Sequence, residues 1–285
     1  MKIGETILPS EQNPKYLGVT LDRQLSYRKH LEGCANKIGK RNCLLRKLTG
    51  TSWGASQTVL RTSTLALCYS VAEYCAPVWT RSSHTNKVDV KLRESMRLVS
   101  GCLKSTPTQW LPTLSSLTPP HIRREVANQR MIKKIKDMPK HIPLKQIVES
   151  APTTTRLRSR RPFYKSELED FNPIESWRSE WANNTPTGGN LIGDPTQPVP
   201  GFGVQTRKHW VVSNRLLSRH GRTAANMHKW GLKDSQICPR CNGAPETSDH
   251  IVLHCRVTKL DGGYQTILNA GENLTNWIDQ HKLEV

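Results

Sequence analysis

The chain has 285 residues, and its 42 lysines and arginines outnumber its 23 aspartates and glutamates, which gives a formal net charge of +19. This length suffices for one large domain or two modest ones, and eight cysteines are too few for a disulfide scaffold. The sequence has no uninterrupted apolar run of about 18 residues and no pattern of a secretory signal, so a transmembrane helix is excluded and an intracellular location, nuclear or cytoplasmic, is expected.

The positive charge predicts a polyanionic partner. Nucleic acid is the first candidate, because a basic surface attracts phosphate groups, and an acidic membrane surface is the second. A basic protein without a specific polyanionic partner is the remaining alternative.

The first 24 residues have the pattern of a β-hairpin. Residues 3–8 and 15–21 are apolar or β-branched runs, and the polar residues 9–14 separate them. Two strands alone are only marginally stable in water. We therefore interpret residues 1–24 as the remnant of a larger structure.

Residues 25–118 predict a helical bundle, in which the first helix has an apolar face and a basic face. The apolar face consists of Leu25, Leu31, Cys34, Ile38, Leu45 and Leu48, and the basic face of Arg28, Lys29, Lys37, Lys40, Arg41 and Lys47. A second helix is expected over residues 55–74 and a third over residues 88–102. The core candidates of the second helix are Val59, Leu65, Leu67, Cys68 and Val71.

Residues 119–206 combine a basic helix with an irregular segment. A helical pattern covers residues 121–136, and residues 121–165 contain 13 lysines and arginines against 3 acids, a local net charge of +10. The densest part of this charge includes Arg158, Arg160 and Arg161. It is expected to be a solvated loop that can still neutralise phosphates. Residues 183–206 are rich in Asn, Gly, Pro and Thr, which predicts a linker or an ordered irregular loop.

The C-terminal residues 207–285 contain the most specific local motif. Its members are Cys238, Cys241, His250 and Cys255, with the spacing C-x2-C-x8-H-x4-C. Two thiolates on one tight turn, followed by a histidine and a cysteine, can complete a tetrahedron around a structural Zn²⁺ ion. Spacing alone leaves His254 as an alternative to His250. A chance grouping is another interpretation, and so is a redox C-x-x-C, which would need a thioredoxin-like context that the sequence does not indicate.

A basic helix is predicted over residues 209–230, just before this cluster. Its basic groups near Gly221 are Arg215, Arg219, His220 and Arg222. They can bring guanidinium and backbone N–H groups to a phosphate, or they can form the basic end of a helix that terminates at Gly221. Trp210 and Trp230 can stack on bases, although packing in a small core explains them better.

The sequence does not contain a recognisable catalytic set. A two-metal polymerase needs paired carboxylates at the reacting phosphate, and no Asp-Asp pair is present. A Walker A loop, an H-E-x-x-H motif and a credible Ser/His/Asp set are also missing. We therefore expect no bound Mg²⁺ and no independent catalytic activity.

Several separate motifs resemble the non-LTR retrotransposon reverse transcriptases of the LINE and jockey type. Residues 15–22 (KYLGVTLD) are similar to the segment that follows the catalytic palm of these enzymes. Residues 66–79 (ALCYSVAEYCAPVW), 101–104 (GCLK) and 119–124 (PPHIRR) resemble jockey-like elements. The stretch 219–222 (RHGR) and the Cys/His cluster follow in the family's order, so the resemblance covers nearly the whole chain.

The resemblance implies a role for each part. Residues 1–24 would contain the primer grip, with Tyr16 and Gly18 near the primer end, and residues 25–118 would form the helical thumb. Residues 207–285 would form a basic helix and a zinc knuckle, in which the family takes the histidine at the position of His250 as the ligand. The family's catalytic aspartates and endonuclease domain would precede the first residue of this sequence. Arg219 and Thr223 stand where many relatives have Gly and Cys, so phosphate contacts there are a hypothesis.

We therefore expect a mainly α protein with an N-terminal hairpin remnant, a thumb-like bundle, a basic linker and a zinc-knuckle module. Its partners would be RNA and DNA, as a primer–template duplex, element RNA or target DNA, together with the palm and endonuclease portion of a full-length polymerase, and not a membrane. The residues expected to contact nucleic acid are Tyr16, Gly18, Arg28, Lys29, Lys37, Lys40, Arg41, Arg123, Arg124, Arg158, Arg160, Arg161, Arg215, Arg219, His220 and Arg222. A truncated copy of an active RNA-directed DNA polymerase and a domesticated zinc-dependent adaptor for proteins are the alternatives.

Overall fold

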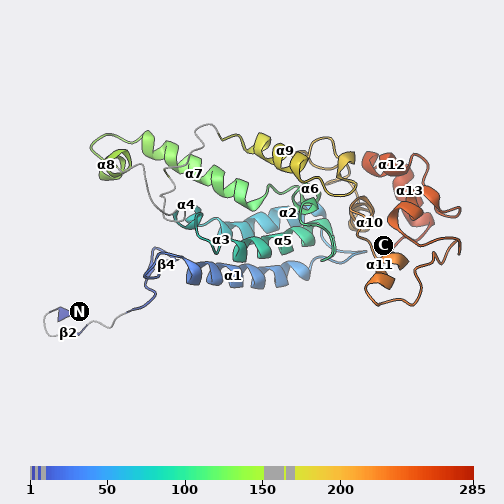
Figure 1. Cartoon of the computed structure of the whole chain (residues 1–285), viewed down its shortest axis with the longest axis horizontal. Coiled ribbons are helices and arrows are strands. Elements are labelled where there is room, and N and C mark those ends of the chain that lie inside the picture. The colour runs from blue at the N-terminus through green and yellow to red at the C-terminus, as the bar shows by residue number, and fades with distance from the viewer. Residues whose placement is uncertain (1, 4–5, 8–10, 151–163, 165–170) are drawn as a thin grey trace.

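A computed structural model describes residues 2–3, 6–7, 11–150, 164 and 171–285 of the chain. The fold is mainly helical and elongated, with the N-terminal strands at one end and a small C-terminal module at the other (Figure 1). These features and a C-terminal group of three cysteines and one histidine confirm the predicted fold class. Among the helices of the described residues, none has the length and apolar character that crossing a bilayer requires.

The N-terminal residues form two short antiparallel hairpins rather than one. β1 (Lys2–Ile3) pairs with β2 (Thr6–Ile7), and β3 (Lys15–Tyr16) pairs with β4 (Val19–Thr20). Between β3 and β4, Leu17 and Gly18 have φ values of 44° and 84°, and two successive positive φ values are typical of a two-residue hairpin turn. The hydroxyl of Tyr74 donates to the carbonyl oxygen of Leu17 at 2.8 Å, which attaches this turn to the helical bundle.

The central bundle contains two long helices that pack side by side, α1 (Arg28–Arg46) and α5 (Asn86–Ser100) (Figure 1). Its shorter elements are α2 (Gln57–Thr64), the π-helical turn η1 (Leu65–Tyr69), α3 (Ser70–Ala72), α4 (Ala76–Trp79) and α6 (Trp110–Ser115). Leu31, Ile38 and Met96 are fully buried in this bundle. Burial of such side chains stabilises the fold by about 1.5–3 kcal/mol each.

The three helices predicted in this bundle are confirmed, but four of the predicted core residues are wrong. Leu25 and Leu48 are exposed because they lie outside α1, where helical periodicity no longer applies. Val59 is exposed because α2 directs the neighbouring Leu60 into the core instead. Leu67 is partly exposed because it lies in the π turn η1, whose wider spacing shifts the helical register.

Three outer helices follow: α7 (Pro120–Lys136), α8 (Pro143–Ser150) and α9 (Pro173–Asn183). Each begins at a proline, whose missing N–H has no cost in the first turn of a helix. The side chain of Asn172 caps α9 by accepting hydrogen bonds from two backbone N–H groups of its first turn. Trp181 of α9 packs edge-on against Trp110 of α6, with ring centroids 5.5 Å apart, and so connects the outer layer to the bundle.

Residues 184–206 form an ordered irregular loop with one 3-10 turn, η4 (Gly189–Leu191). Ile192 and Val199 are buried in the hydrophobic core. The carboxylate of Asp194 accepts hydrogen bonds from Thr196 in the same loop and from Arg178 of α9, one of the latter 2.6 Å long. The segment is therefore a packed part of the fold.

The C-terminal part consists of α10 (Arg207–Leu217), α11 (Ala224–Lys229), the π-helical turn η5 (His250–His254), α12 (Gly263–Asn269) and α13 (Glu272–Gln280). The prediction of one continuous helix over residues 209–230 is wrong. Arg219 adopts a left-handed φ of 58° after α10, and Thr223 caps α11 by accepting a hydrogen bond from the N–H of Asn226. Such a bond between a side chain and the backbone competes with continuation of the preceding helix.

α10 lies between the bundle and the C-terminal elements and provides donors for the end of α5 (Figure 1). The last four carbonyl oxygens of a helix have no donor within it. Arg207, Asn214 and Arg215 donate to the carbonyl oxygens of Leu98, Val99, Ser100 and Gly101 at 2.6–2.9 Å. Burial lowers the pKa of both arginines to about 10, and the negative end of the helix dipole stabilises their charges.

Gly101 permits this close approach. It has a φ of 74°, and a Cβ atom there would overlap the side chain of Val211 in α10. We expect Gly101→Ala to lower the free energy of unfolding by about 2–4 kcal/mol, because it combines a left-handed backbone with overpacking. Chemical denaturation followed by circular dichroism measures the loss. Gly33→Ala is the matched control, because Gly33 of α1 faces open space and its replacement should stabilise the helix by about 0.5–1 kcal/mol.

An unchanged stability of Gly101→Ala would contradict the packing of α10 on α5. Loss of that packing should destabilise both the bundle and the C-terminal elements, because buried apolar side chains from Leu31 to Val285 form one contiguous cluster.

Candidate metal centre and basic surface

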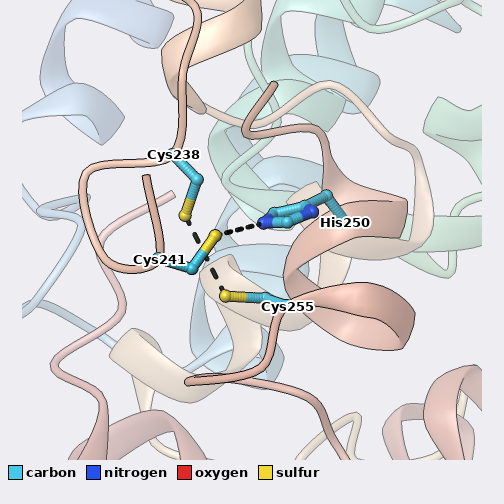
Figure 2. Close-up of side chains that lie close together, drawn as sticks. All are labelled: Cys238, Cys241, His250 and Cys255. Carbon is cyan, nitrogen blue, oxygen red and sulfur yellow. Dashed lines mark hydrogen bonds between the residues drawn. The ribbon is translucent and has the colours of Figure 1, made fainter. Parts of the chain in front are cut away.

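Four side chains near the C-terminus form a compact ligand group: Cys238, Cys241, His250 and Cys255 (Figure 2). All four are buried, and their ligand atoms lie within 4.8 Å of one another. The Sγ atom of Cys241 lies 3.3 Å from Nε2 of His250, and the Sγ atoms of Cys238 and Cys255 lie 4.0 Å apart. A tetrahedral Zn²⁺ ion with Zn–S bonds of about 2.3 Å holds two sulfur ligands about 3.8 Å apart, so the group fits zinc. Four protein ligands leave no open position, which makes the site structural.

The first two ligands are positioned by a tight turn. The N–H of Cys238 donates to the carbonyl oxygen of Ala244 at 2.8 Å, and the N–H of Asn242 donates to that of Cys238 at 2.9 Å. Asn242 adopts a left-handed φ of 53°, which reverses the chain directly after Cys241. The N–H of Gly243 then points to the Sγ atom of Cys241 at 3.5 Å, so the turn orients and partly neutralises a metal-binding sulfur.

The other two ligands come from the turn η5 and the residue after it. His250 begins η5, and the N–H of Cys255 donates to its carbonyl oxygen at 2.7 Å. His254 lies at the opposite end of η5, is exposed and does not belong to the ligand group. The three-dimensional arrangement therefore selects His250 from the two histidines that spacing left open.

Hydrogen bonds favour the thiolate form of Cys255. Burial alone would raise the pKa of its thiol, but donors that include the hydroxyl and N–H of Thr258 and the N–H of Val257 bring that pKa down to about 6. Burial raises the pKa of Cys238. Because zinc binds the thiolate, a thiol that is mostly deprotonated at neutral pH suits a metal ligand.

The metal centre shares its supporting segments with the hydrophobic core. Ile251 and Val252, which follow His250 in η5, are fully buried in the main cluster. On the other side, the carboxylate of the buried Glu246 accepts a hydrogen bond from the N–H of Ala224 at the start of α11, at 2.6 Å. A carboxylate at this position also stabilises the helix dipole. Loss of the metal is therefore expected to disturb both α11 and the core.

Asp249 connects this centre to α12 and to one of the predicted phosphate-binding residues. Its Oδ1 atom accepts a hydrogen bond from Nε of Arg219 at 2.8 Å and another from the hydroxyl of Tyr264 at 2.7 Å. The guanidinium of Arg219 also lies 4.7 Å from the centroid of the Tyr264 ring. Asp249 and Tyr264 have no recognisable signal in the sequence, because 30 residues separate Arg219 from Asp249 and no local pattern relates them.

Arg123 and Arg124 have acidic partners inside the chain. Arg124 forms two hydrogen bonds with the buried carboxylate of Asp89 in α5, one of them 2.9 Å long. Arg123 forms a two-pronged ion pair with Glu73, and its guanidinium lies 4.9 Å from the centroid of the Tyr69 ring. Both pairs attach α7 to the bundle, so the charges of these two arginines are already balanced within the chain.

The other predicted contact residues near α10 have different exposures. Arg215 is buried and also donates to the main-chain oxygen of Val285 at 2.8 Å. His220 is partly buried, and burial together with the charge of Lys229 lowers its pKa. Arg222 is exposed. Of these three side chains, only that of Arg222 is exposed and can present its charge to a ligand in solvent.

In the N-terminal hairpin, Tyr16 is 68% exposed and Gly18 lies against the ring of Tyr74. The predicted contact residues Arg158, Arg160 and Arg161 lie outside the described residues.

α1 brings several of the predicted contact residues together on one exposed face. The predicted contact residues Lys29, Lys37 and Lys40 are exposed there, and so is Lys47, the helical C-cap residue directly after α1. Arg28 is also exposed but pairs with Glu32 at 3.1 Å, and Arg41 donates to the carbonyl oxygen of Leu67. We call Lys29, Lys40 and Lys47 the lysine row, because successive members are separated by nearly whole numbers of helical turns.

Comparison with known proteins relates these features to one family. Residues 204–260, which contain the Cys/His group, match the family described as zinc-binding in reverse transcriptase. The chain is 22% identical over 265 residues to the "Retrovirus-related Pol polyprotein from type-1 retrotransposable element R1 4" of Nasonia vitripennis, an alignment that covers 90% of this chain and 63% of the relative. It is 24% identical over 271 residues to the corresponding Nasonia vitripennis protein of element R1 2, an alignment that covers 90% of this chain and 60% of the relative.

The chain therefore spans about 60% of the length of the curated relatives that it matches. No solved structure gives a significant match. The family match covers the zinc ligands, and the two relatives align with nearly all of the remaining chain. The chain is thus similar to R1-type retrotransposon Pol polyproteins over 90% of its length, and its residues 204–260, with the Cys/His group, match the zinc-binding domain of reverse transcriptases.

Proposed function

We propose that this chain is a nucleic-acid-binding part of an R1-type reverse transcriptase and that the lysine row on α1 contacts the phosphate backbone of RNA and DNA. The row itself is the observation that supports this proposal. The net charge of +19 favours a polyanionic ligand, and the relatives are named Pol polyproteins.

The spacing of the lysine row suits a nucleic-acid strand. Lys40 and Lys47 follow Lys29 after about three and five helical turns, so the three side chains leave α1 in the same direction. At 1.5 Å per residue the row extends over about 27 Å. That length corresponds to about eight nucleotides of one strand at 3.4 Å each.

The surroundings of the row leave its charge available. Glu32 is the acidic residue of α1, and its carboxylate is already shared among Arg28, Lys29 and Lys87. Within the described part of the chain, neither Lys40 nor Lys47 takes part in an ion pair. Gly33 lies between members of the row and faces open space, so a phosphate backbone can approach the helix closely.

We propose a supporting role for the zinc centre. Zinc would order the segment that carries exposed basic residues such as Arg222, Lys229 and Lys233, and these would provide further phosphate contacts. We propose binding and not polymerisation for this chain alone, because two-metal catalysis needs paired carboxylates and the sequence has no Asp-Asp pair. Primer extension by the purified chain would contradict that part.

Charge reversal tests the row. We expect Lys40→Glu combined with Lys47→Glu to weaken binding to an RNA–DNA duplex by about tenfold or more at low salt, because two phosphate contacts become repulsive. The slope of log affinity against log salt concentration should also become less negative by about two, because two phosphate contacts are lost. Fluorescence anisotropy with a labelled duplex, titrated at several salt concentrations, measures both quantities.

Lys104→Glu is the matched control, because Lys104 is exposed in the loop after α5 and lies outside the row. Its single charge reversal should change affinity less than either Lys40→Glu or Lys47→Glu alone. Affinity of the original chain that does not depend on salt would exclude phosphate contacts. Equal losses in the control and row variants would show a diffuse charge effect instead of a defined surface.

A further inference from the structure

Trp53 is held in an exposed position at the end of the lysine row. It lies in the loop between α1 and α2 and is 63% exposed. Tryptophan buries a large apolar area when it finds a partner, and its rigid side chain loses little conformational entropy on binding. An exposed indole that the fold fixes in place therefore indicates a contact with something outside the described chain.

The loop fixes the indole by stacking it on a glycine. A Cβ atom at Gly50 would lie 2.6 Å from the Trp53 ring, so the ring rests directly on the backbone of Gly50. Backbone pairing holds the two ends of this loop together. Thr49 and Gly54 form an isolated antiparallel β-bridge, and the N–H of Ala55 donates to the carbonyl oxygen of Leu48 at 3.0 Å. One face of the indole is thus occupied by the backbone, and the side chain remains largely open to solvent.

Arg207 anchors this loop to the core. Its Nε atom donates to the carbonyl oxygen of Gly50 at 3.2 Å, while its other nitrogens bind the end of α5. Gly50, the residue beneath the indole, is therefore tied to the junction of α5 and α10. Such a platform is preorganised, which reduces the entropy that a ligand must overcome.

The electrostatic surroundings point to an anionic partner. Residues 47–61 contain no aspartate or glutamate, and Lys47, the last member of the lysine row, stands at the start of the loop. Gly50 follows Lys47 by three residues, so their Cα atoms are at most about 11 Å apart. A strand that follows the row would cover this distance with about three further nucleotides.

We propose that Trp53 is a stacking platform for an unpaired nucleobase, at the point where a strand bound along the lysine row continues beyond its duplex. This inference rests on the proposed function and adds a ligand class to it: nucleic acid with a single-stranded extension. Stacking on an aromatic side chain suits any base, because every base has a π face, so we expect little sequence preference.

The test compares a blunt RNA–DNA duplex with the same duplex that has an unpaired extension at one end. We expect Trp53→Ala to weaken binding of the extended duplex by about tenfold, the order of loss for one stacked base, and to change binding of the blunt duplex by less than about twofold. Trp53→Phe should retain most of the affinity because it keeps an aromatic face. A fluorescent purine analogue in the extension should be quenched by the original chain and much less by Trp53→Ala.

Leu48→Ala is the matched control, because Leu48 is an exposed apolar residue of the same loop without an aromatic ring. It should bind both duplexes like the original chain, and the thermal unfolding of all three variants should be unchanged. If the original chain binds both duplexes and Trp53→Ala binds them equally well, the stacking inference is wrong while the proposed function stands. If the original chain binds neither duplex at any salt concentration, both are wrong.

Discussion

Replacement of Cys241 by serine is expected to remove stoichiometric zinc binding and to unfold the C-terminal module. Cys241 is one of four buried ligands, and a structural zinc site contributes about 10–16 kcal/mol of apparent binding free energy in small zinc modules at neutral pH. Serine provides a hard oxygen in place of a thiolate, and the remaining three ligands bind zinc far more weakly. Metal analysis of the purified protein should find one zinc per chain before the substitution and only a small fraction of one after it.

The loss should extend beyond the metal site, because η5 provides both His250 and the core residues Ile251 and Val252. We expect a loss of at least about 4 kcal/mol, which lowers the unfolding temperature by about 10 °C or more. Limited proteolysis should detect faster cleavage around residues 231–262. Removal of zinc from the original chain by a chelator should produce the same proteolytic pattern.

Two matched controls make this prediction specific. Cys43→Ser changes an exposed cysteine of α1 outside the ligand group, so zinc content and stability should not change. His250→Ala should behave like Cys241→Ser, whereas His254→Ala should retain zinc because that side chain is exposed at the other end of η5. Zinc loss in His254→Ala with retention in His250→Ala would exclude the arrangement described here.

Replacement of Arg124 by methionine is expected to lower the free energy of unfolding by about 3–5 kcal/mol. The side chains of Arg124 and Asp89 are only 7% and 13% exposed, and the guanidinium also lies 5.9 Å from the centroid of the Trp79 ring. Removing the arginine leaves the Asp89 carboxylate buried without its counter-ion, which costs more than the ion pair itself contributes. Chemical denaturation measures the change.

The neighbouring arginine provides the control. In the Arg123–Glu73 pair both side chains are 30% exposed, so Arg123→Met should cost only about 1–2 kcal/mol. The double variant Asp89→Leu with Arg124→Met should recover part of the loss of Arg124→Met, because no buried charge remains. Equal losses of unfolding free energy in Arg123→Met and Arg124→Met would contradict the expectation that the more buried ion pair is the costlier one to break. Nucleic-acid affinity measured on the folded fraction should be similar for both.

These two arginines show why charge patterns predict a surface only in part. From the sequence, Arg123, Arg124 and Arg215 are indistinguishable from the lysines of α1, because all are basic residues in helical segments. The structure pairs Arg124 with Asp89, 35 residues away, and directs Arg215 to a carbonyl oxygen 114 residues away. Guanidinium groups can satisfy several acceptors at once, so arginine tolerates burial where lysine rarely does. The lysine row on α1 was therefore the more reliable part of the prediction of an exposed basic surface.

The long helices of the chain were predictable for the opposite reason. Apolar residues at helical spacing identify a helix wherever its face is buried, and α1, α5 and α7 follow this rule. The same rule merged α10 and α11 into one helix. The interruption depends on the left-handed Arg219 and on the cap at Thr223, and neither is visible as a break in periodicity.

The sequence by itself determined the helical character of this protein, its basic charge and the four-residue zinc motif, because each depends on residues that are close along the chain. Spacing left His254 open as a ligand, the family resemblance favoured His250, and the tertiary structure places His250 in the metal centre. Tertiary structure alone decided that Arg124 and Arg215 face inward and that Trp53 rests on Gly50 in the open. Local spacing fixes which side chains share a turn or a helix face. Which of them become buried or exposed depends on how distant segments pack together, and that packing minimises the number of buried charges and polar groups without partners.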